Sequence, residues 1–491
     1  MIMVNDAASS LPDPGATSHE VLAHLQAGKC TTKALISEYL NFLETTGKRL
    51  GAVVEVFSQS ALQEAEASDA RRMAGETLGV LEGIPFTAKM NICTEEGTTD
   101  ASSAMLAGFE AGVDATVVQK MRSAGAILVG KSSCDEFAMG ASNESSAHGV
   151  VRNPWDESRV PGGSSGGAAA LAGAFGWAIH LGSDTGGSIR QPAAFCSATG
   201  MKPTWGRVSR RGLIAFGSSL DQIGPLARDA KDCQIALEVL QGSDPLDATS
   251  LSFSESSKEP IRKIAWIRQG FGEGIDASIR EQVEAARSIL EKDGIEFVEV
   301  SLPTMAQANA CYQVIATAEA SSNLARYDGI HVGKRLSSND LEELYSSSRS
   351  SGFGAEVRRR ILLGTFVLSS GYIDAYYGRA QSVRQEIREE ILSALDDVDA
   401  LMMPVSPFAP FKIGERIDDP LALYACDILT VTANLAGVPA VAVPCAFDNE
   451  GLPVGMQWLG KHGDDHRLLQ LASLWQELND TWKSVPQGGQ S

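Results

Sequence analysis

The sequence predicts an α/β fold with a central, mixed and partly parallel twisted sheet that is covered by helices. Short apolar runs alternate along the chain with longer segments whose apolar residues recur at helical spacing. A length of 491 residues, 48 of them glycine, is enough for one large core. We expect a single domain at 17–480, with its catalytic core at about 80–230, between flexible segments at 1–16 and 481–491.

The individual elements follow from local patterns taken in chain order. Residues 11–18 are rich in Pro, Gly and Ser and are expected to be loose; two short helices follow, and the second has apolar residues four apart at Leu35, Tyr39 and Leu43. The strands are predicted at 84–88, 126–129, 177–181, 263–267, 296–300, 400–403 and 440–443. Further helices are predicted at 117–121, 165–175, 275–292, 372–395 and 464–478.

Composition excludes several functional classes. A formal charge of −20 argues against a surface on this chain that follows the phosphates of a nucleic acid. Eight cysteines without C-x-x-C or Cys/His spacing predict reduced, mostly buried thiols, and neither disulfides nor zinc. The amino terminus lacks the pattern of a signal peptide, and the uncharged stretches 160–183 and 428–447 indicate buried helix-to-strand units. We therefore expect a cytoplasmic protein without membrane spans.

Three short segments carry the chemistry: residues 83–89, 161–167 and 182–188. They supply Lys89, Ser164 and Ser188, the two serines within runs of glycine that let backbone approach a ligand closely. Acyl transfer needs a hydroxyl nucleophile, a base and N–H donors for the developing oxyanion, and these segments offer all three without a histidine.

Other readings of the same glycines fit less well. The segment 162–166 matches the G-x-S-x-G elbow of α/β-hydrolases, but a polar, turn-forming stretch precedes it where the elbow needs a buried strand. An aspartic protease would need a second copy of Asp184-Thr185-Gly186, and a P-loop would need a lysine after Gly167. Simple turn formation explains one glycine cluster but not the coincidence of three.

Together these segments resemble the amidase signature family, and within it the branch formed by the A subunits of glutamyl-tRNA(Gln)/aspartyl-tRNA(Asn) amidotransferases. The likeness to that branch runs along most of the chain, through 135–140, 200–204, 218–225, 319–329 and 363–372. The resemblance implies the amidase-signature fold. It also implies hydrolysis or transfer of a carboxamide nitrogen by a Ser–cis-Ser–Lys triad.

Carried over segment by segment, the resemblance makes Ser188 the nucleophile, Ser164 the bridging serine after a cis Gly163–Ser164 peptide, and Lys89 the base. The backbone N–H groups of Thr185, Gly186, Gly187 and Ser188 would form the oxyanion hole. A lysine is a poor base at its ordinary pKa near 10.4, so burial has to lower the pKa of Lys89. The alternative to a catalytic role for this lysine, which lies at the end of a predicted strand, is a surface ion pair.

The resemblance also implies residues that bind free glutamine. Arg360 would pair with the α-carboxylate, Asp427 with the α-ammonium, and Tyr312 would line the pocket. The alternative is that residues 358–360 form one basic helix turn that faces solvent, and Arg359 competes with Arg360 for the proposed role. No metal ligand is assigned.

Three functions are compatible with these residues. The favoured hypothesis is a glutaminase subunit whose ammonia a partner uses to amidate Glu-tRNA(Gln), or Asp-tRNA(Asn), in an ATP-dependent step. B and C subunits would complete a heterotrimer, and the partner subunit would hold most of the tRNA together with ATP and Mg²⁺; no cofactor is expected in this chain. The alternatives are a free-standing amidase for a small acyl or aryl amide, and an inactive scaffold.

Two positions depart from the branch. Met90 stands where an aspartate usually follows the lysine, and Trp205 stands where tyrosine is commoner. The loss of a carboxylate beside Lys89 should favour its neutral form.

Overall fold

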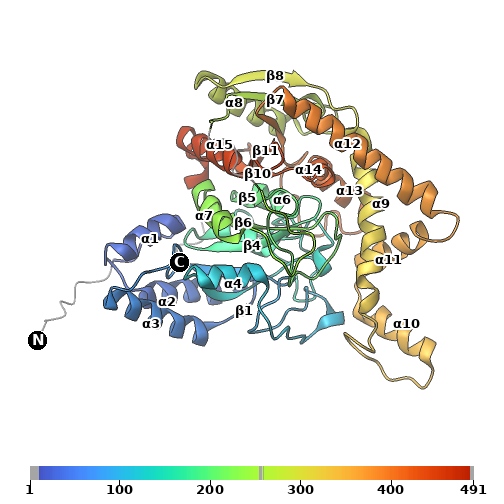
Figure 1. Cartoon of the computed structure of the whole chain (residues 1–491), viewed down its shortest axis with the longest axis horizontal. Helices are drawn as coiled ribbons and strands as arrows, with labels where there is room; N and C mark the ends of the chain where they lie inside the picture. The colour runs from blue at the N-terminus through green and yellow to red at the C-terminus, as the bar shows by residue number, and fades with distance from the viewer. Residues whose placement is uncertain (1–9, 254–256, 258, 487–491) are drawn as a thin grey trace, which may run out of the picture.

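One mixed sheet runs through the middle of the molecule (Figure 1). The computed structural model describes residues 10–253, 257 and 259–486. The 11-stranded sheet has the order β1-β3-β2-β4-β6-β5-β10-β11-β9-β7-β8. The strands are β1 (Val53–Val56), β2 (Pro85–Lys89), β3 (Ile127–Ser132), β4 (Ile179–Asp184), β5 (Thr199–Lys202), β6 (Gln222–Ala227), β7 (Lys263–Ile267), β8 (Glu296–Val300), β9 (Ala400–Pro404), β10 (Ala440–Phe447) and β11 (Pro453–Gly460).

Parallel and antiparallel pairing alternate in blocks across the sheet. β2 lies between β3 and β4 and is parallel to both. β7 is likewise parallel to its neighbours β8 and β9. The strands between these blocks pair antiparallel, including the β10–β11 hairpin. The predicted mixed, partly parallel sheet is therefore confirmed.

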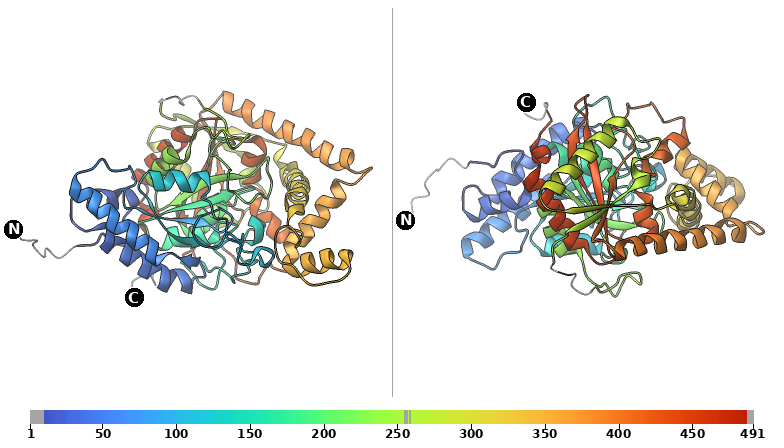
Figure 2. Two further views of the ribbon diagram at one scale, coloured as in Figure 1. Left: turned by 60° about the horizontal axis from the view of Figure 1, so that its bottom comes forward. Right: turned by 90° about the horizontal axis from the view of Figure 1, so that it is seen from above.

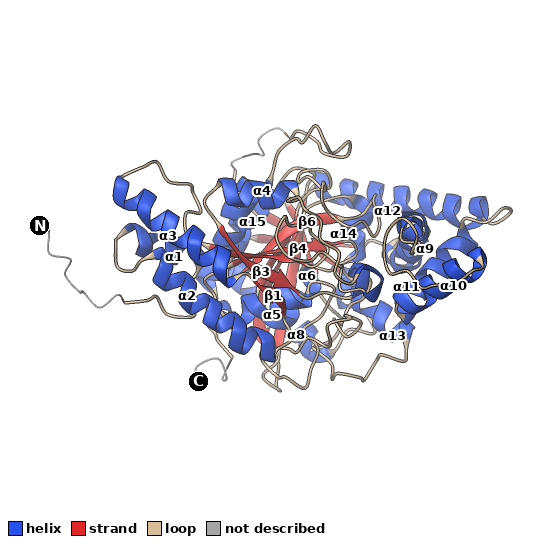
Figure 3. Ribbon diagram, turned by 90° about the horizontal axis from the view of Figure 1, so that it is seen from below, coloured by secondary structure: helices blue, strands red, loops and turns tan. Residues whose placement is uncertain are grey.

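Helices cover both faces of this sheet, as Figure 3 shows. α1–α3 lie at one end of the molecule and α9–α12 at the other, in all the views of Figures 1 and 2. The helices are α1 (Ser18–Gln26), α2 (Thr32–Phe42), α3 (Ser58–Ala74), α4 (Thr116–Ser123), α5 (Gly166–Ala174), α6 (Arg190–Cys196), α7 (Ala230–Leu240), α8 (Ala277–Lys292), α9 (Met305–Asn323), α10 (Leu341–Gly352), α11 (Ala355–Val367), α12 (Arg379–Asp396), α13 (Pro420–Tyr424), α14 (Val431–Ala436) and α15 (Asp465–Leu478).

The helix after the first glycine cluster is built for close packing. α5 consists of glycine and alanine apart from Leu171, and most of its residues are buried. A Cβ on Gly167 would lie 2.5 Å from the carbonyl oxygen of Ala52, and a Cβ on Gly173 would lie 2.1 Å from that of Cys196. Any larger residue at these two positions would push the neighbouring backbone away. This packing fixes where α5 starts, directly after Ser164 and Ser165.

Most elements predicted from sequence are present, including all seven predicted strands. The stretch 160–183 contains α5 and most of β4, and 428–447 contains α14 and β10, so both are buried helix-to-strand units as expected. Within the described part of the chain, no helix combines the length and the apolar content that crossing a bilayer requires. All eight cysteines are free, and all but Cys93 are buried.

The chain ends are held more firmly than the sequence suggested. The Trp177 indole nitrogen donates to the Asp13 carbonyl at 2.7 Å, and the Gly176 N–H donates to that of Pro14 at 2.9 Å. Residues 13 and 14 are thus tied to the body of the fold, where a loose segment was predicted. Near the other end, Asp480–Lys483 form a 3₁₀ helix. The predicted flexibility of 1–9 and 487–491 concerns residues outside the described chain.

Candidate active site

Strand β2 delivers Lys89 into the interior of the protein. The side chain is fully buried, and its amine donates to Ser164 Oγ at 2.7 Å, to Ser165 Oγ at 2.9 Å and to Ser183 Oγ at 3.0 Å. Burial lowers the pKa of Lys89 to about 8, against the opposing charges of nearby acidic groups. The surface ion pair considered for this lysine does not form among the described residues.

Ser164 lies in the loop that leads into α5. The Gly163–Ser164 peptide is cis, as the resemblance implied. The Gly163 N–H donates to Gln191 Oε1 at 2.9 Å, and a Cβ on Gly163 would lie 2.1 Å from Asp135 Oδ2. This loop is therefore packed tightly against the segment that carries Asp135, and the Ser164 hydroxyl is held against Lys89.

Ser188 occupies the turn between β4 and α6. Its carbonyl accepts the N–H of Ser165 at 3.0 Å, which brings the two serine segments together. Its side chain is nearly buried, the residue being 5% exposed, and its hydroxyl makes no hydrogen bond to any described residue. The Lys89–Ser164 half of the expected relay is thus present as a hydrogen bond, and the Ser164–Ser188 half stays a prediction.

The same turn exposes a row of backbone donors. The N–H groups of residues 185–188 donate no hydrogen bond to any of the described residues. Side chains fix the row from both sides: Thr185 Oγ1 donates to Asp221 Oδ1 at 2.7 Å, and Thr430 Oγ1 donates to the Gly186 carbonyl at 2.5 Å. Four such donors next to a serine hydroxyl suit the stabilisation of an oxyanion.

Beside these loops is a cavity of about 230 Å³. Its lining includes Glu356, Arg360, Tyr424 and Asp427, from α11 and the segment around α13. A Cβ on Gly187 would lie 3.1 Å from Asp427 Oδ1, so this wall of the cavity touches the turn that carries Ser188. The cavity is large enough for a small amide substrate but not for a macromolecule.

Arg360 and Arg359 have different surroundings. The Arg360 side chain is 6% exposed and donates from Nε to Glu356 Oε1 at 2.7 Å, while the Tyr424 hydroxyl donates to the same oxygen at 2.9 Å. Its guanidinium lies over the rings of Tyr424 and Phe216. The Arg359 side chain also pairs with Glu356 but is 42% exposed. The solvent-facing turn considered from sequence therefore describes Arg359 and not Arg360.

Asp427 is half-buried in the wall of this cavity, and the Oδ1 atom of its carboxylate is shielded from solvent. Its Oδ1 atom has no hydrogen-bond partner among the described residues. Burial raises the pKa of Asp427 to about 8, although Arg360 partly offsets this effect. Tyr312 lies against the same turn, since a Cβ on Gly186 would be 2.6 Å from its ring, but it is not among the residues that line the cavity. The three residues expected to bind glutamine thus gather around the predicted oxyanion hole.

Sequence reasoning missed the residues that hold this arrangement together. Glu356 orients Arg360, Thr430 holds Gly186, and Asp221 holds Thr185. Asp221 lies in the segment 218–225, which resembles the family but carries no predicted role, and Thr430 lies three residues after Asp427. No local pattern identifies Glu356, because a glutamate one turn before an arginine is common on solvated helices.

The two residues that depart from the amidotransferase branch, Met90 and Trp205, have different surroundings. Met90 is fully buried directly after Lys89, so no carboxylate stands beside the amine at that position. The Trp205 indole nitrogen is buried without a hydrogen-bond partner among the described residues. Trp205 lines a surface hollow near α12 and α14, away from Lys89.

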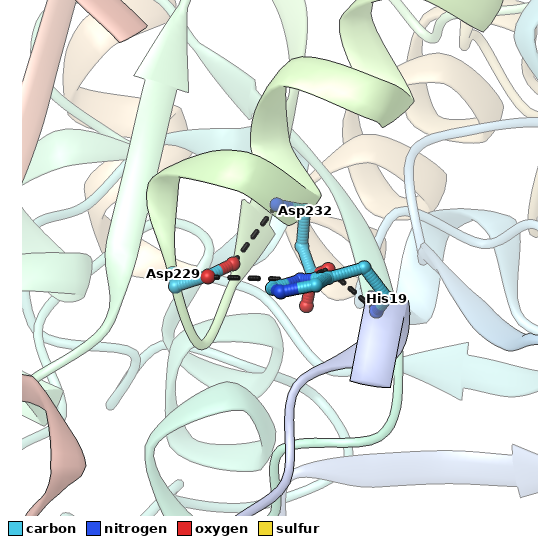
Figure 4. A group of neighbouring side chains, drawn as sticks. All are labelled: His19, Asp229 and Asp232. Carbon is cyan, nitrogen blue, oxygen red and sulfur yellow. Dashed lines mark hydrogen bonds and ion pairs between the residues drawn. The ribbon is translucent and has the colours of Figure 1, made fainter. Parts of the chain in front are cut away.

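One group of side chains in the described chain has atoms close enough to hold a metal ion: His19, Asp229 and Asp232 (Figure 4). His19 Nδ1 lies 2.9 Å from Asp232 Oδ1 and 3.7 Å from Asp229 Oδ2. The Asp232 carboxylate also accepts the N–H groups of Ser18 and His19 at the start of α1. These contacts already join α1 to α7, so the group has a structural role without a metal.

Comparison with known proteins identifies the family of this chain. The family model described as Amidase matches residues 34–469. A relative from Halorhodospira halophila, named as the A subunit of glutamyl-tRNA(Gln) amidotransferase, is 48% identical over 480 residues, which cover 96% of this chain and 99% of the relative. A relative of the same name from Synechococcus sp. is 47% identical over 472 residues, covering 94% and 96%.

Solved structures show the same likeness. The crystal structure of the glutamyl-tRNA(Gln) amidotransferase A subunit from Thermotoga maritima superposes with a TM-score of 0.77, at 39% identity and 94% coverage of both chains. Native peptide amidase from Stenotrophomonas maltophilia superposes with a TM-score of 0.81, at 27% identity, covering 98% of this chain and 100% of that one. The chain therefore belongs to the amidase family, as the three segments that carry Lys89, Ser164 and Ser188 predicted.

Proposed function

We propose that this chain is the glutaminase subunit of a tRNA-dependent amidotransferase. It would release ammonia from glutamine for the ATP-dependent conversion of misacylated Glu-tRNA(Gln) to Gln-tRNA(Gln), with Asp-tRNA(Asn) as the alternative acceptor. The observation that carries the proposal is one small cavity lined by a buried arginine, Arg360, and a half-buried aspartate, Asp427, whose Oδ1 atom is shielded from solvent. The cavity lies beside four N–H groups that donate to no described residue. The names of the relatives at 47–48% identity support it.

Recognition follows from charge. Free glutamine carries an α-carboxylate and an α-ammonium, and a buried site has to neutralise both. Arg360 offers the carboxylate guanidinium donors that Glu356 does not use, and guanidinium–carboxylate hydrogen bonds are stronger than neutral ones. Asp427 offers the ammonium a carboxylate oxygen that no other described residue occupies. The side-chain amide would then point towards Ser188.

Catalysis uses a relay through two hydroxyls. Neutral Lys89 accepts the Ser164 proton while Ser164 accepts the Ser188 proton, and Ser188 Oγ attacks the amide carbon. The N–H groups of residues 185–188 stabilise the oxyanion. The relay then returns the proton to the leaving nitrogen, ammonia departs, and a glutamyl ester remains on Ser188. Water, activated by the same relay, hydrolyses the ester to glutamate.

The remaining steps belong to partner subunits. A formal charge of −20 makes this chain a poor tRNA-binding surface, so we assign most of the tRNA contact, ATP and Mg²⁺ to a B subunit, with a C subunit completing a heterotrimer. A second candidate is a free-standing amidase for small amides. It is favoured by the likeness to peptide amidase, whose structure superposes at a TM-score of 0.81.

The test is ammonia release by the purified chain, alone and with its partners, ATP and misacylated tRNA. Ser188→Ala should abolish release, and Lys89→Ala should lower it by about 10²–10⁴-fold, the usual loss of a general base. Ser132→Ala is the matched control, because this buried serine pairs with Lys89 in the sheet and its hydroxyl has no partner among described residues. Near-normal release by Ser188→Ala would refute the proposal.

A further inference from the structure

The Lys89 amine has more neighbours than the proposed triad uses. Besides Ser164, it donates to Ser165 Oγ and Ser183 Oγ, and the Asn91 side-chain amide donates from Nδ2 to Ser183 Oγ at 3.0 Å. We propose that Asn91 is a positioning residue, which acts through Ser183 to aim the Lys89 amine at Ser164. This inference rests on the proposed function insofar as it takes Lys89 as the base.

The valence of the Lys89 amine limits which of its neighbours can accept from it and which can donate to it. As the base, neutral Lys89 keeps two N–H bonds and one lone pair, and only a lone pair directed at Ser164 can accept the proton. Ser165 Oγ donates its own hydrogen to the Ser183 carbonyl at 3.1 Å, so it faces Lys89 as an acceptor and takes one N–H. The second N–H needs another acceptor, and Ser183 Oγ at 3.0 Å is the nearest remaining one.

Asn91 holds that acceptor in place. A serine hydroxyl on a strand can rotate about χ1 between three staggered positions. The Asn91 N–H bond favours the rotamer in which Ser183 Oγ lies between the amide and the amine. With Ser165 and Ser183 each taking one N–H, the lone pair is left for Ser164 at 2.7 Å.

The alternative explanation is that Asn91 is an ordinary core residue whose amide makes all of its hydrogen bonds, and its contacts argue against this. The residue is 1% exposed, yet its Oδ1 atom has no hydrogen-bond partner among the described residues. The one hydrogen bond that its side chain makes within the described chain goes to Ser183. A half-satisfied buried amide costs stability, so its presence next to the proposed base is better explained by what it does to Ser183.

A change of charge at position 91 should also change the pKa of Lys89, which can be measured. The titratable groups that act on Lys89 are Cys134, Asp135, Asp184 and Asp221, and a negative charge on any of them opposes the lowering of the Lys89 pKa by burial. Burial raises the pKa of the Cys134 thiol to about 11, so the carboxyl groups are the main source of such charge near neutral pH. Asn91 is uncharged, and its amide is linked to the Lys89 amine through the Ser183 hydroxyl. A carboxylate in its place would add another negative charge and raise the pH at which Lys89 loses its proton.

The experiment measures ammonia release from glutamine and from propionamide between pH 6 and 10, for the unchanged protein, Asn91→Ala and Asn91→Asp. We expect Asn91→Ala to lower kcat about 10-fold on both substrates with KM unchanged, the loss that one hydrogen bond implies. Asn91→Asp should move the acidic limb of the kcat profile upwards by about one pH unit or more. Ser183→Ala should lower kcat similarly, and adding Asn91→Ala to it should change little further, because one network is involved.

Thr87→Val is the matched control. Thr87 is a buried β2 residue whose hydroxyl bonds to His180 at 2.9 Å and not to the Lys89 amine, so its loss should leave the limb of the profile in place. Additive losses from Asn91→Ala and Ser183→Ala, or an unmoved limb in a folded Asn91→Asp protein, would overturn the inference while leaving the proposed function intact. Absence of ammonia release by the unchanged protein from both amides would overturn the proposed function and the inference with it.

Discussion

Asp184 and Arg190 form an ion pair across the turn that carries Ser188, with Arg190 Nε 3.0 Å from Asp184 Oδ2 and both side chains fully buried. Asn434 Nδ2 donates to Asp184 Oδ1 at 2.8 Å, and Arg190 Nη1 donates to Gln457 Oε1 at 2.8 Å. Burial alone would raise the pKa of Asp184, but Arg190 lowers it to about 2. The four predicted oxyanion donors therefore lie on a turn whose two ends are bonded to each other and to the sheet.

Removing Arg190 should destabilise the protein strongly. Arg190→Ala leaves the Asp184 carboxylate buried without its counter-ion, which typically costs about 3–5 kcal/mol. Urea unfolding followed by circular dichroism measures the loss as a lower midpoint. Arg268→Ala is the control, because its pair with Glu299 is on the surface and such pairs contribute about 0–1 kcal/mol. Equal decreases of the urea midpoint in the two variants would show that the buried pair contributes no more to stability than the surface pair.

Activity should rise with pH through the titration of Lys89. Only the neutral amine is a base, so below the pKa of about 8 the free protein is mostly in the inactive, protonated form. We expect kcat/KM to increase up to tenfold per pH unit from pH 6 towards 8 and to flatten above it. Steady-state kinetics on propionamide, which lacks charged groups, measures this directly.

A second buried lysine makes a control necessary. Burial also lowers the pKa of Lys131 to about 8, but its amine donates to the Ile92 carbonyl at 2.5 Å and to Thr94 and Thr99. Lys131→Met, in a sample checked for folding, should keep the same profile. A profile that moves with Lys131, or one that falls from pH 6 to 9 in the unchanged protein, would contradict Lys89 as the base.

Arg360 should matter for glutamine and not for simple amides. Truncating one partner of a buried charge-assisted pair typically costs about 2–5 kcal/mol, so Arg360→Ala should lower kcat/KM for glutamine roughly 30-fold to several thousand-fold. Propionamide has no carboxylate, and its turnover should change little. Arg359→Ala is the matched control, one residue away with an exposed side chain. Equal losses on both substrates would assign Arg360 a role in the fold alone.

Helices and strands were predictable where a local pattern identifies them, either a regular spacing of apolar residues or a cluster of small residues. The strand before Lys89 and the small-residue helix after Ser164 have such local signals, and both lie within one residue of their predicted ends. β11 was not predicted, although it is fully buried and pairs with β9 and β10. Because every residue of β11 is buried, its sequence shows no alternation of apolar and polar residues that would identify a strand.

The site was predictable for residues in glycine-rich segments and not for those that support them. Gly186 and Gly187 are needed because Tyr312 and Thr430 approach them too closely for a side chain, and the glycines alone are visible in the sequence. The partner residues come from α9 and from the segment before α14, more than a hundred residues away. The choice between Arg359 and Arg360 likewise depended on burial. Both side chains pair with Glu356, but only that of Arg360 is buried, and the sequence does not show which of two adjacent helical residues points inwards.

Glutamine should bind more tightly as the pH rises from 6 towards 8. Burial raises the pKa of Asp427 to about 8, so below that pH its carboxyl is mostly protonated and neutral in the free protein. The α-ammonium of glutamine requires the ionised form, and each pH unit below the pKa costs about 1.4 kcal/mol of binding free energy. KM for glutamine should therefore fall up to tenfold per unit from pH 6 towards 8. Asp427→Asn should raise KM and remove this dependence, while the pH profile of kcat on propionamide, set by Lys89, stays as it was. A KM that is independent of pH in the unchanged protein and unaltered by Asp427→Asn would show that this carboxylate does not bind the ammonium.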